Sequence, residues 1–239
     1  MEVVAKFINS RYFKRLQELY DIMFVILGGS RSIDTELEGS DYDLFIYYKS
    51  SKINHICNRE ILEYKFIADN NIEIHYTLIH IDNFFKTSAP YSNNGILYQS
   101  ININIIFIND KYSKIIEKII KMNKSNDVEN IFLKRSLKYI NPNVIDKLDN
   151  WDDVSIPNPK TFFIFAFPLL YASIIDISKL KEICKKIKMY NRKENIDTDF
   201  EKEITTYIQS GYDKILKINI DENIEFEKLN LRLKEILYD

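Results

Sequence analysis

The stretch LGGSRSIDTELEGSDYDLFIYY, residues 27–48, decides how this chain folds and where its chemistry lies. It continues the apolar run MFVIL (23–27), which predicts a buried strand that ends at Gly28 and Gly29. Glycine lets a backbone approach a ligand closely, and a turn that enters a helix points N–H groups at an anion. The turn Gly28-Gly29-Ser30 is therefore a candidate phosphate site, and the Ser30 hydroxyl adds a donor to it.

Two carboxylates stand where the next strand begins. Asp41 and Asp43 follow Ser30 after ten intervening residues, and YDLFIYY (42–48) is rich in strand formers. Side chains alternate along a strand, so both aspartates project from the same face. Two carboxylates held side by side repel each other, and a divalent cation such as Mg²⁺ removes that penalty. The pair is therefore a candidate metal site.

A third carboxylate follows on a predicted hairpin, LEYKFIADNNIEIHYTL (62–78), whose turn is expected at residues 69–71. Glu73 faces away from its apolar neighbours Ile72 and Ile74. If this strand pairs beside residues 42–48, three carboxylates meet near the glycine-serine turn, as metal-assisted phosphoryl or nucleotidyl transfer requires. His75 shares the face of Glu73, which makes it either a residue at the rim of the site or a structural histidine.

Joined at this spacing, these residues resemble the polymerase-beta-like nucleotidyltransferase superfamily. The family pattern is Gly then Gly or Ser, a gap of about ten residues, Asp-hydrophobic-Asp/Glu-hydrophobic, and a later acid on a strand. This sequence has Gly29-Ser30, then Asp41-Tyr42-Asp43-Leu44, then Ile72-Glu73-Ile74, and Arg31 completes the Gly-Ser-Arg opening frequent in small bacterial members. The layout is similar to that of antibiotic nucleotidyltransferases, which modify aminoglycosides and lincosamides and also carry a helical C-terminal half. The specific match covers residues 27–76.

The resemblance implies an enzyme that moves a nucleoside monophosphate, AMP from ATP in the simplest case, onto a hydroxyl of an aminoglycoside-like small molecule and releases pyrophosphate. It implies two Mg²⁺ ions at the active site. The nucleotide substrate is ATP or, alternatively, another nucleoside triphosphate. Two other readings stay open: a toxin-type or defence-type enzyme that modifies tRNA or protein, and a nucleotide-binding module without catalysis. The expected catalytic and metal-binding residues are Asp41, Asp43 and Glu73, and the expected nucleotide-binding residues are Gly28, Gly29, Ser30, Arg31 and Ser40.

The rest of the chain predicts an α+β protein: an N-terminal mixed-sheet domain (1–122) followed by an all-helical acceptor-binding domain (123–239). The polar, unpatterned segment MNKSND (122–127) marks the boundary. A helix over 2–21 with a break near residues 9–10, and a strand over 100–109, complete the first half. Helices are expected from residue 110 and over 128–139, 160–176, 178–189, 198–209 and 224–238.

Charge and composition limit the kinds of molecule that the protein is expected to bind. The net charge of −2 argues against a protein whose main task is to grip nucleic acid. Lys134, Arg135 and Lys138 could still form a patch for a triphosphate or RNA, or a plain solvated face. The acidic turn 149–153 could hold a general base or bind a cationic acceptor, or it could be a loop rich in helix-capping residues. The apolar stretch 162–175 is too short to cross a bilayer, so no membrane partner is expected, and two distant cysteines favour a reduced, cytoplasmic setting.

Overall fold

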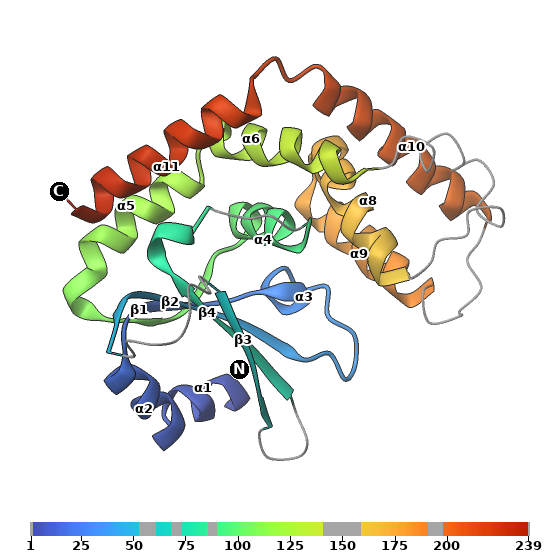
Figure 1. The fold of residues 1–239 in the computed structure, drawn as a ribbon. Helices are drawn as coiled ribbons and strands as arrows, with labels where there is room; N and C mark the ends of the chain where they lie inside the picture. The colour runs from blue at the N-terminus through green and yellow to red at the C-terminus, as the bar shows by residue number, and fades with distance from the viewer. Residues whose placement is uncertain are drawn as a thin grey trace.

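A mixed five-stranded sheet forms the centre of the N-terminal half (Figure 1). The computed structural model describes residues 2–52, 61–67, 73–85, 90–140, 159–190 and 198–238. The strands lie in the order β3-β4-β2-β1-β5. Only the β2–β4 pairing is parallel among these neighbours, and the other three are antiparallel. The bounds are β1 Tyr20–Leu27, β2 Tyr42–Ser51, β3 Ile61–Ile67, β4 Glu73–His80 and β5 Asn104–Ile108.

Two helices at the start of the chain, α1 (Glu2–Ile8) and α2 (Arg11–Leu19), cover one face of the sheet (Figure 1). Even-numbered side chains of β2 and β4, such as Leu44 and Tyr76, pack there against Phe7 and Phe13. The expected break between the helices is confirmed, because the Ser10 hydroxyl accepts a hydrogen bond from the Phe13 N–H at 3.1 Å and so begins α2.

The opposite face of the sheet turns toward the remaining helices. Odd-numbered side chains such as Tyr47 and Ile79 belong to the core cluster that these helices build. This arrangement separates the apolar layer under α1 and α2 from the face that carries Asp41 and Asp43. The helices are α4 (Pro90–Ile101), α5 (Ser113–Asn123), α6 (Asn126–Ser136), α8 (Pro159–Ser173), α9 (Ile177–Tyr190), α10 (Thr198–Leu216) and α11 (Glu222–Tyr238), with short turns η2 (Ile81–Asn83), η3 (Asp110–Tyr112) and η4 (Leu137–Tyr139).

The α+β class, a mixed sheet followed by helices, is confirmed. The strand expected over 100–109 was wrong at its start: α4 runs to Ile101, and β5 begins at Asn104. The expected turn at 69–71 lies outside the described residues. The helix expected over 160–176 is α8, with Phe163, Phe167 and Leu170 in the core.

One hydrophobic core joins the sheet to the helical half. Ile119 and Met122, before the expected domain boundary, share a cluster with Val128 and Phe132 after it. The division at 122/123 therefore crosses continuous packing and stays a prediction. Cys184 is a buried thiol whose pKa burial raises to about 12, whereas Cys57 lies outside the described residues. Within the described segments, every helix is too short or too polar to traverse a bilayer.

Candidate active site

The glycine turn after β1 lies directly against the second aspartate. Gly28 donates its N–H to the Asp43 carbonyl oxygen at 2.7 Å. Gly29 has a φ of +61°, and a Cβ on it would collide with the Asp43 carboxylate. A Cβ on Gly28 would collide with the Phe45 ring. A side chain at Gly28 would have to displace this ring, whereas Gly29 also has the left-handed backbone that favours glycine. The turn that begins α3 (Gly29–Ser32) thus holds its backbone beside a carboxylate.

The parallel pairing of β2 with β4 brings the acidic ends of both strands together. Asp43 stands opposite His75 in the register, one step after Tyr42 opposite Ile74. Ligand atoms of Asp41, Asp43 and His75 lie within 4.8 Å of one another, and all three side chains are partly exposed. His75 Nδ1 is 3.3 Å from Asp41 Oδ2. Two carboxylates and an imidazole nitrogen at this spacing fit a divalent cation.

Glu73 lies on the same sheet face, at the first residue of β4, with His75 between it and Asp41. Its Oε2 atom is 3.2 Å from His75 Nε2, and its Oε1 atom is 2.5 Å from Lys65 Nζ. Hydrogen bonds from Lys65 and then His75 hold the pKa of Glu73 below its ordinary value. Within the described residues, the group of three candidate ligands contains His75 and leaves Glu73 beside it. A direct metal bond from Glu73 stays a prediction.

Arg31 and Ser40 order the loop that leads to Asp41. The Arg31 guanidinium donates to the Asp41 carbonyl at 3.0 Å and the Ser40 carbonyl at 2.6 Å, and it lies 4.0 Å from the Tyr42 ring centroid. The Ser40 hydroxyl accepts from the Leu37 N–H at 3.0 Å. Both side chains thus fix the entry to β2, and their expected contacts with a nucleotide stay predictions.

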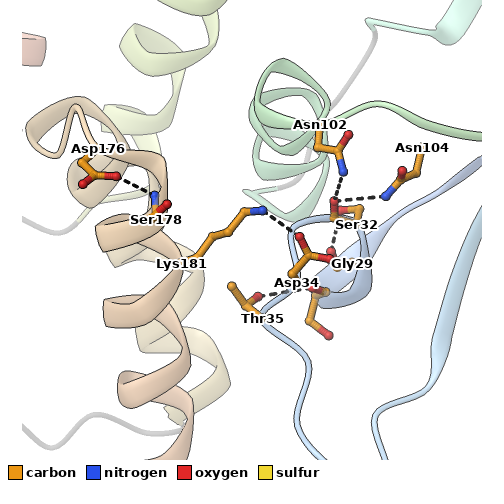
Figure 2. Close-up of polar contacts among 10 residues, drawn as sticks. Gly29, Ser32, Asp34, Thr35, Asn102, Asn104, Asp176, Ser178 and Lys181 are labelled. Atoms are coloured by element: carbon orange, nitrogen blue, oxygen red, sulfur yellow. Dashed lines mark hydrogen bonds and ion pairs between the residues drawn. The ribbon is translucent and has the colours of Figure 1, made fainter.

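The carbonyl groups of α3 are held by residues distant in sequence (Figure 2). Asn102 and Asn104 donate their side-chain amides to the Ser32 carbonyl at 3.2 and 3.3 Å. The Thr35 N–H donates to the Ser30 carbonyl at 2.9 Å. These bonds fix the end of the turn away from Asp43. Both asparagines fall in the segment that the sequence predicted only as a strand over 100–109.

Helix α9 contributes two lysines to the same region. Lys188 donates to the carbonyl and hydroxyl oxygens of buried Thr35 at 3.0 and 2.7 Å. Burial lowers the pKa of the Lys188 ammonium to about 8. Lys181 pairs with Asp34 at 2.7 Å (Figure 2). The helical half therefore braces the loop behind the glycine turn, a role that nothing in the sequence pattern had indicated.

The basic cluster on α6 and the turn η4 that follows it is engaged within the fold. Lys134 donates to the Leu216 carbonyl at 3.2 Å, at the end of α10. Lys138 pairs with Glu222 at 2.9 Å, and the Arg135 guanidinium lies 3.9 Å from the centroid of the Phe226 ring. These cations fasten α6 to the neighbouring helices. The acidic turn 149–153, expected to offer a general base, lies outside the described residues.

The family comparison agrees with this geometry. The sequence profile of the family described as "Nucleotidyltransferase domain" matches residues 10–148. The chain belongs to this family, and it is a nucleotidyltransferase. Among solved structures it is similar to a nucleotidyltransferase-like protein from Exiguobacterium sibiricum, with 11% identity over 95% of this chain and 78% of that chain and a TM-score of 0.32. A search among curated proteins returns no match.

Proposed function

We propose that this nucleotidyltransferase moves AMP from ATP onto a hydroxyl group of a small molecule, such as an aminoglycoside-like antibiotic, and releases pyrophosphate. The observation that carries the proposal is the contact between the Gly29 backbone and the Asp43 carboxylate, with Asp41 and His75 alongside. A turn suited to phosphate thus adjoins a cluster suited to a dication.

The roles follow from the position of each group. The Gly29 backbone and the Ser30 hydroxyl would bind the β- and γ-phosphates, since a glycine turn tolerates close approach. Asp41 and Asp43 would hold the catalytic cation. The family resemblance implies that this cation is Mg²⁺ and that two such ions bind. When bound, the cation lowers the pKa of the acceptor hydroxyl and offsets charge on the departing pyrophosphate. Arg31 and Ser40 keep Asp41 in place through the loop.

Two observations favour a small acceptor over tRNA. The chain has a net charge of −2, and a protein that grips nucleic acid usually shows a basic excess. Lys134, Arg135 and Lys138, which could have formed an RNA-binding stripe, instead hold α10 and α11. The aspartates lie on the sheet face that turns toward the helical half, and we place the small acceptor on this side of the sheet.

The acceptor is identified by following the label. The protein is incubated with each α-³²P-labelled nucleoside triphosphate, a divalent cation, and separate pools of aminoglycosides, lincosamides, tRNA and cell protein. We expect label from ATP on a small molecule that contains hydroxyl groups. Label on tRNA or protein would replace the proposed acceptor, and no transfer to any pool would favour a nucleotide-binding module instead.

Replacing either aspartate should abolish transfer without unfolding the chain. Asp41→Asn and Asp43→Asn remove a charge that holds the cation, so turnover should fall by at least about 10³-fold. The melting temperature should stay equal or rise, since two neighbouring carboxylates repel each other. Asp213→Asn, on the exposed side of α10, is the matched control and should keep full activity. Near-normal turnover in either active-site variant would refute the assignment.

A further inference from the structure

The position of His75 concerns the identity of the catalytic cation. We propose that His75 binds this cation directly through Nδ1, and that the site therefore prefers a first-row transition ion such as Mn²⁺ over Mg²⁺. The inference rests on the proposed function only in placing a cation between Asp41 and Asp43. It departs from the expectation that a third carboxylate, Glu73, completes an all-oxygen site for Mg²⁺.

The two imidazole nitrogens face different groups. Nδ1 is 3.3 Å from Asp41 Oδ2, on the side of the aspartate pair, and Nε2 is 3.2 Å from Glu73 Oε2. Histidines that bind metals usually donate the other ring N–H to a carboxylate, which fixes the tautomer and the ring orientation. His75 already has this arrangement: one nitrogen lies among candidate ligands and the other meets a carboxylate.

An ion pair with Lys65 holds Glu73 beside His75, where it orients the imidazole ring. Its Oε1 atom lies 2.5 Å from Lys65 Nζ on β3, the strand that pairs with β4. For Glu73 to bind the cation, it would have to leave Lys65 and pass the imidazole ring. The chain from Lys65 through Glu73 to His75 therefore orients Nδ1 toward the aspartates and disfavours Glu73 as the third ligand.

The donor set decides the preference among ions. Mg²⁺ takes oxygen ligands in near-ideal octahedral geometry and keeps several of its waters. An imidazole nitrogen adds little for Mg²⁺ but raises affinity for first-row transition ions, which accept mixed nitrogen and oxygen ligands. Mn²⁺ also accepts the two carboxylates. Because affinity for a mixed nitrogen and oxygen site rises from Mn²⁺ to Co²⁺, we expect the site to bind Co²⁺ most tightly, Mn²⁺ less tightly and Mg²⁺ least tightly.

The test uses Mn²⁺ itself as the probe. Electron paramagnetic resonance of the intact protein measures bound Mn²⁺, competition with Mg²⁺ gives the second affinity, and pulsed spectra detect a ¹⁴N nucleus bonded to the ion. We expect ¹⁴N coupling in the unaltered protein and Mn²⁺ affinity at least about 10-fold above that for Mg²⁺. In His75→Ala the coupling should vanish and Mn²⁺ affinity should fall by about 10-fold or more, with Mg²⁺ affinity nearly unchanged.

Three variants complete the design. His80→Ala removes a histidine from the same strand, one that bonds the Lys49 carbonyl at 2.9 Å, and should behave as the unaltered protein. His75→Asp supplies an oxygen ligand instead and should shift the preference toward Mg²⁺. Asp43→Asn should lose both ions. Circular dichroism confirms that each variant is folded.

The outcomes separate this inference from the proposed function. Mn²⁺ that binds through Asp43 without ¹⁴N coupling, or with unchanged affinity in His75→Ala, would overturn the role of His75 and leave the proposed transfer reaction standing. Binding of neither ion to the unaltered protein, together with no transfer of label, would overturn both.

Discussion

Gly29 is the residue on which the placement of Asp43 depends most directly. Its φ of +61° favours glycine, and the space beyond its Cα is filled by the Asp43 carboxylate. A sequence pattern can indicate that a glycine is needed in such a turn. It cannot say which side chain fills the space.

Gly29→Ala should therefore have two effects: it should strain the backbone, and it should also displace the Asp43 carboxylate. Gly39 is a matched position: its φ is +76°, and nothing lies within 4 Å of an added Cβ. We expect both alanine variants to lose about 1 kcal/mol of unfolding free energy from the left-handed backbone. Only Gly29→Ala should also displace Asp43 and lower metal affinity and turnover. Equal activity in the two variants would contradict the contact, and urea unfolding with the label-transfer assay measures both effects.

At His75 and Glu73 the sequence predicts the face of the strand but not the partner. Alternation places both residues on the side of Asp41 and Asp43, and the structure agrees. Which of them reaches the aspartates depends on the register between β2 and β4 and on the Lys65 pairing, which is a contact across strands. Periodicity along one strand carries neither piece of information, so the sequence favoured Glu73 because it is the third carboxylate on this face.

At the scale of elements, the strongly patterned helices and strands were predictable and one helix was not. Helix α4, with the sequence PYSNNGILYQSI, contains Gly95 and several residues of weak helix propensity, and it lacks a clear apolar stripe. The tertiary packing of Leu97 and Ile96 in the core stabilises it instead. The bonds from Asn102 and Asn104 to Ser32 depend on where this helix ends, so the sequence could not reveal them.

Two helical glycines should respond to alanine in opposite directions. A Cβ on Gly211 of α10 would collide with the Leu169 carbonyl of α8, whereas nothing lies within 4 Å of one on Gly95. Gly211→Ala should thus force α8 and α10 apart and cost about 1–3 kcal/mol. Gly95→Ala should stabilise α4 by about 0.5–1 kcal/mol, since alanine is the better helix former. Chemical unfolding of both variants measures the difference, and a stable Gly211→Ala would mean that the two helices are not in backbone contact.

At the scale of the whole molecule, the two halves are joined by a shared core and by the lysines of α9. Lys188 crosses from the helical half to Thr35, and Thr35 in turn bonds the Ser30 carbonyl. A lysine in the helical half thereby supports the glycine turn that follows β1 in the N-terminal half. No local pattern could predict this, because the two residues are far apart in the sequence.

The buried Lys188 should give stability a distinctive dependence on pH. Its pKa is lowered to about 8 in the folded protein by burial, from 10.5 in the unfolded chain. Between these values the unfolded chain binds more protons, so the free energy of unfolding should rise with pH, by up to about 3 kcal/mol for this group. Lys188→Met removes the titrating group and keeps the length of the side chain.

Other groups that titrate in this range cancel when the two proteins are compared. The unfolding free energy of the unaltered protein should therefore increase relative to Lys188→Met between pH 7 and pH 10. Urea unfolding at both pH values provides the measurement. A gap that does not change with pH would show that Lys188 keeps its ordinary affinity for protons in the folded state.

The alternation of side chains across β2 also governs how a folding error would reveal itself. A slip of one residue would turn Asp41 and Asp43 toward Phe7 and Tyr76, in the aromatic layer beneath α1 and α2. Ionised groups without partners are poorly tolerated in such surroundings. Mispaired chains would therefore be less stable than correctly paired ones, so the pairing that folds most stably is also the one that assembles the candidate site.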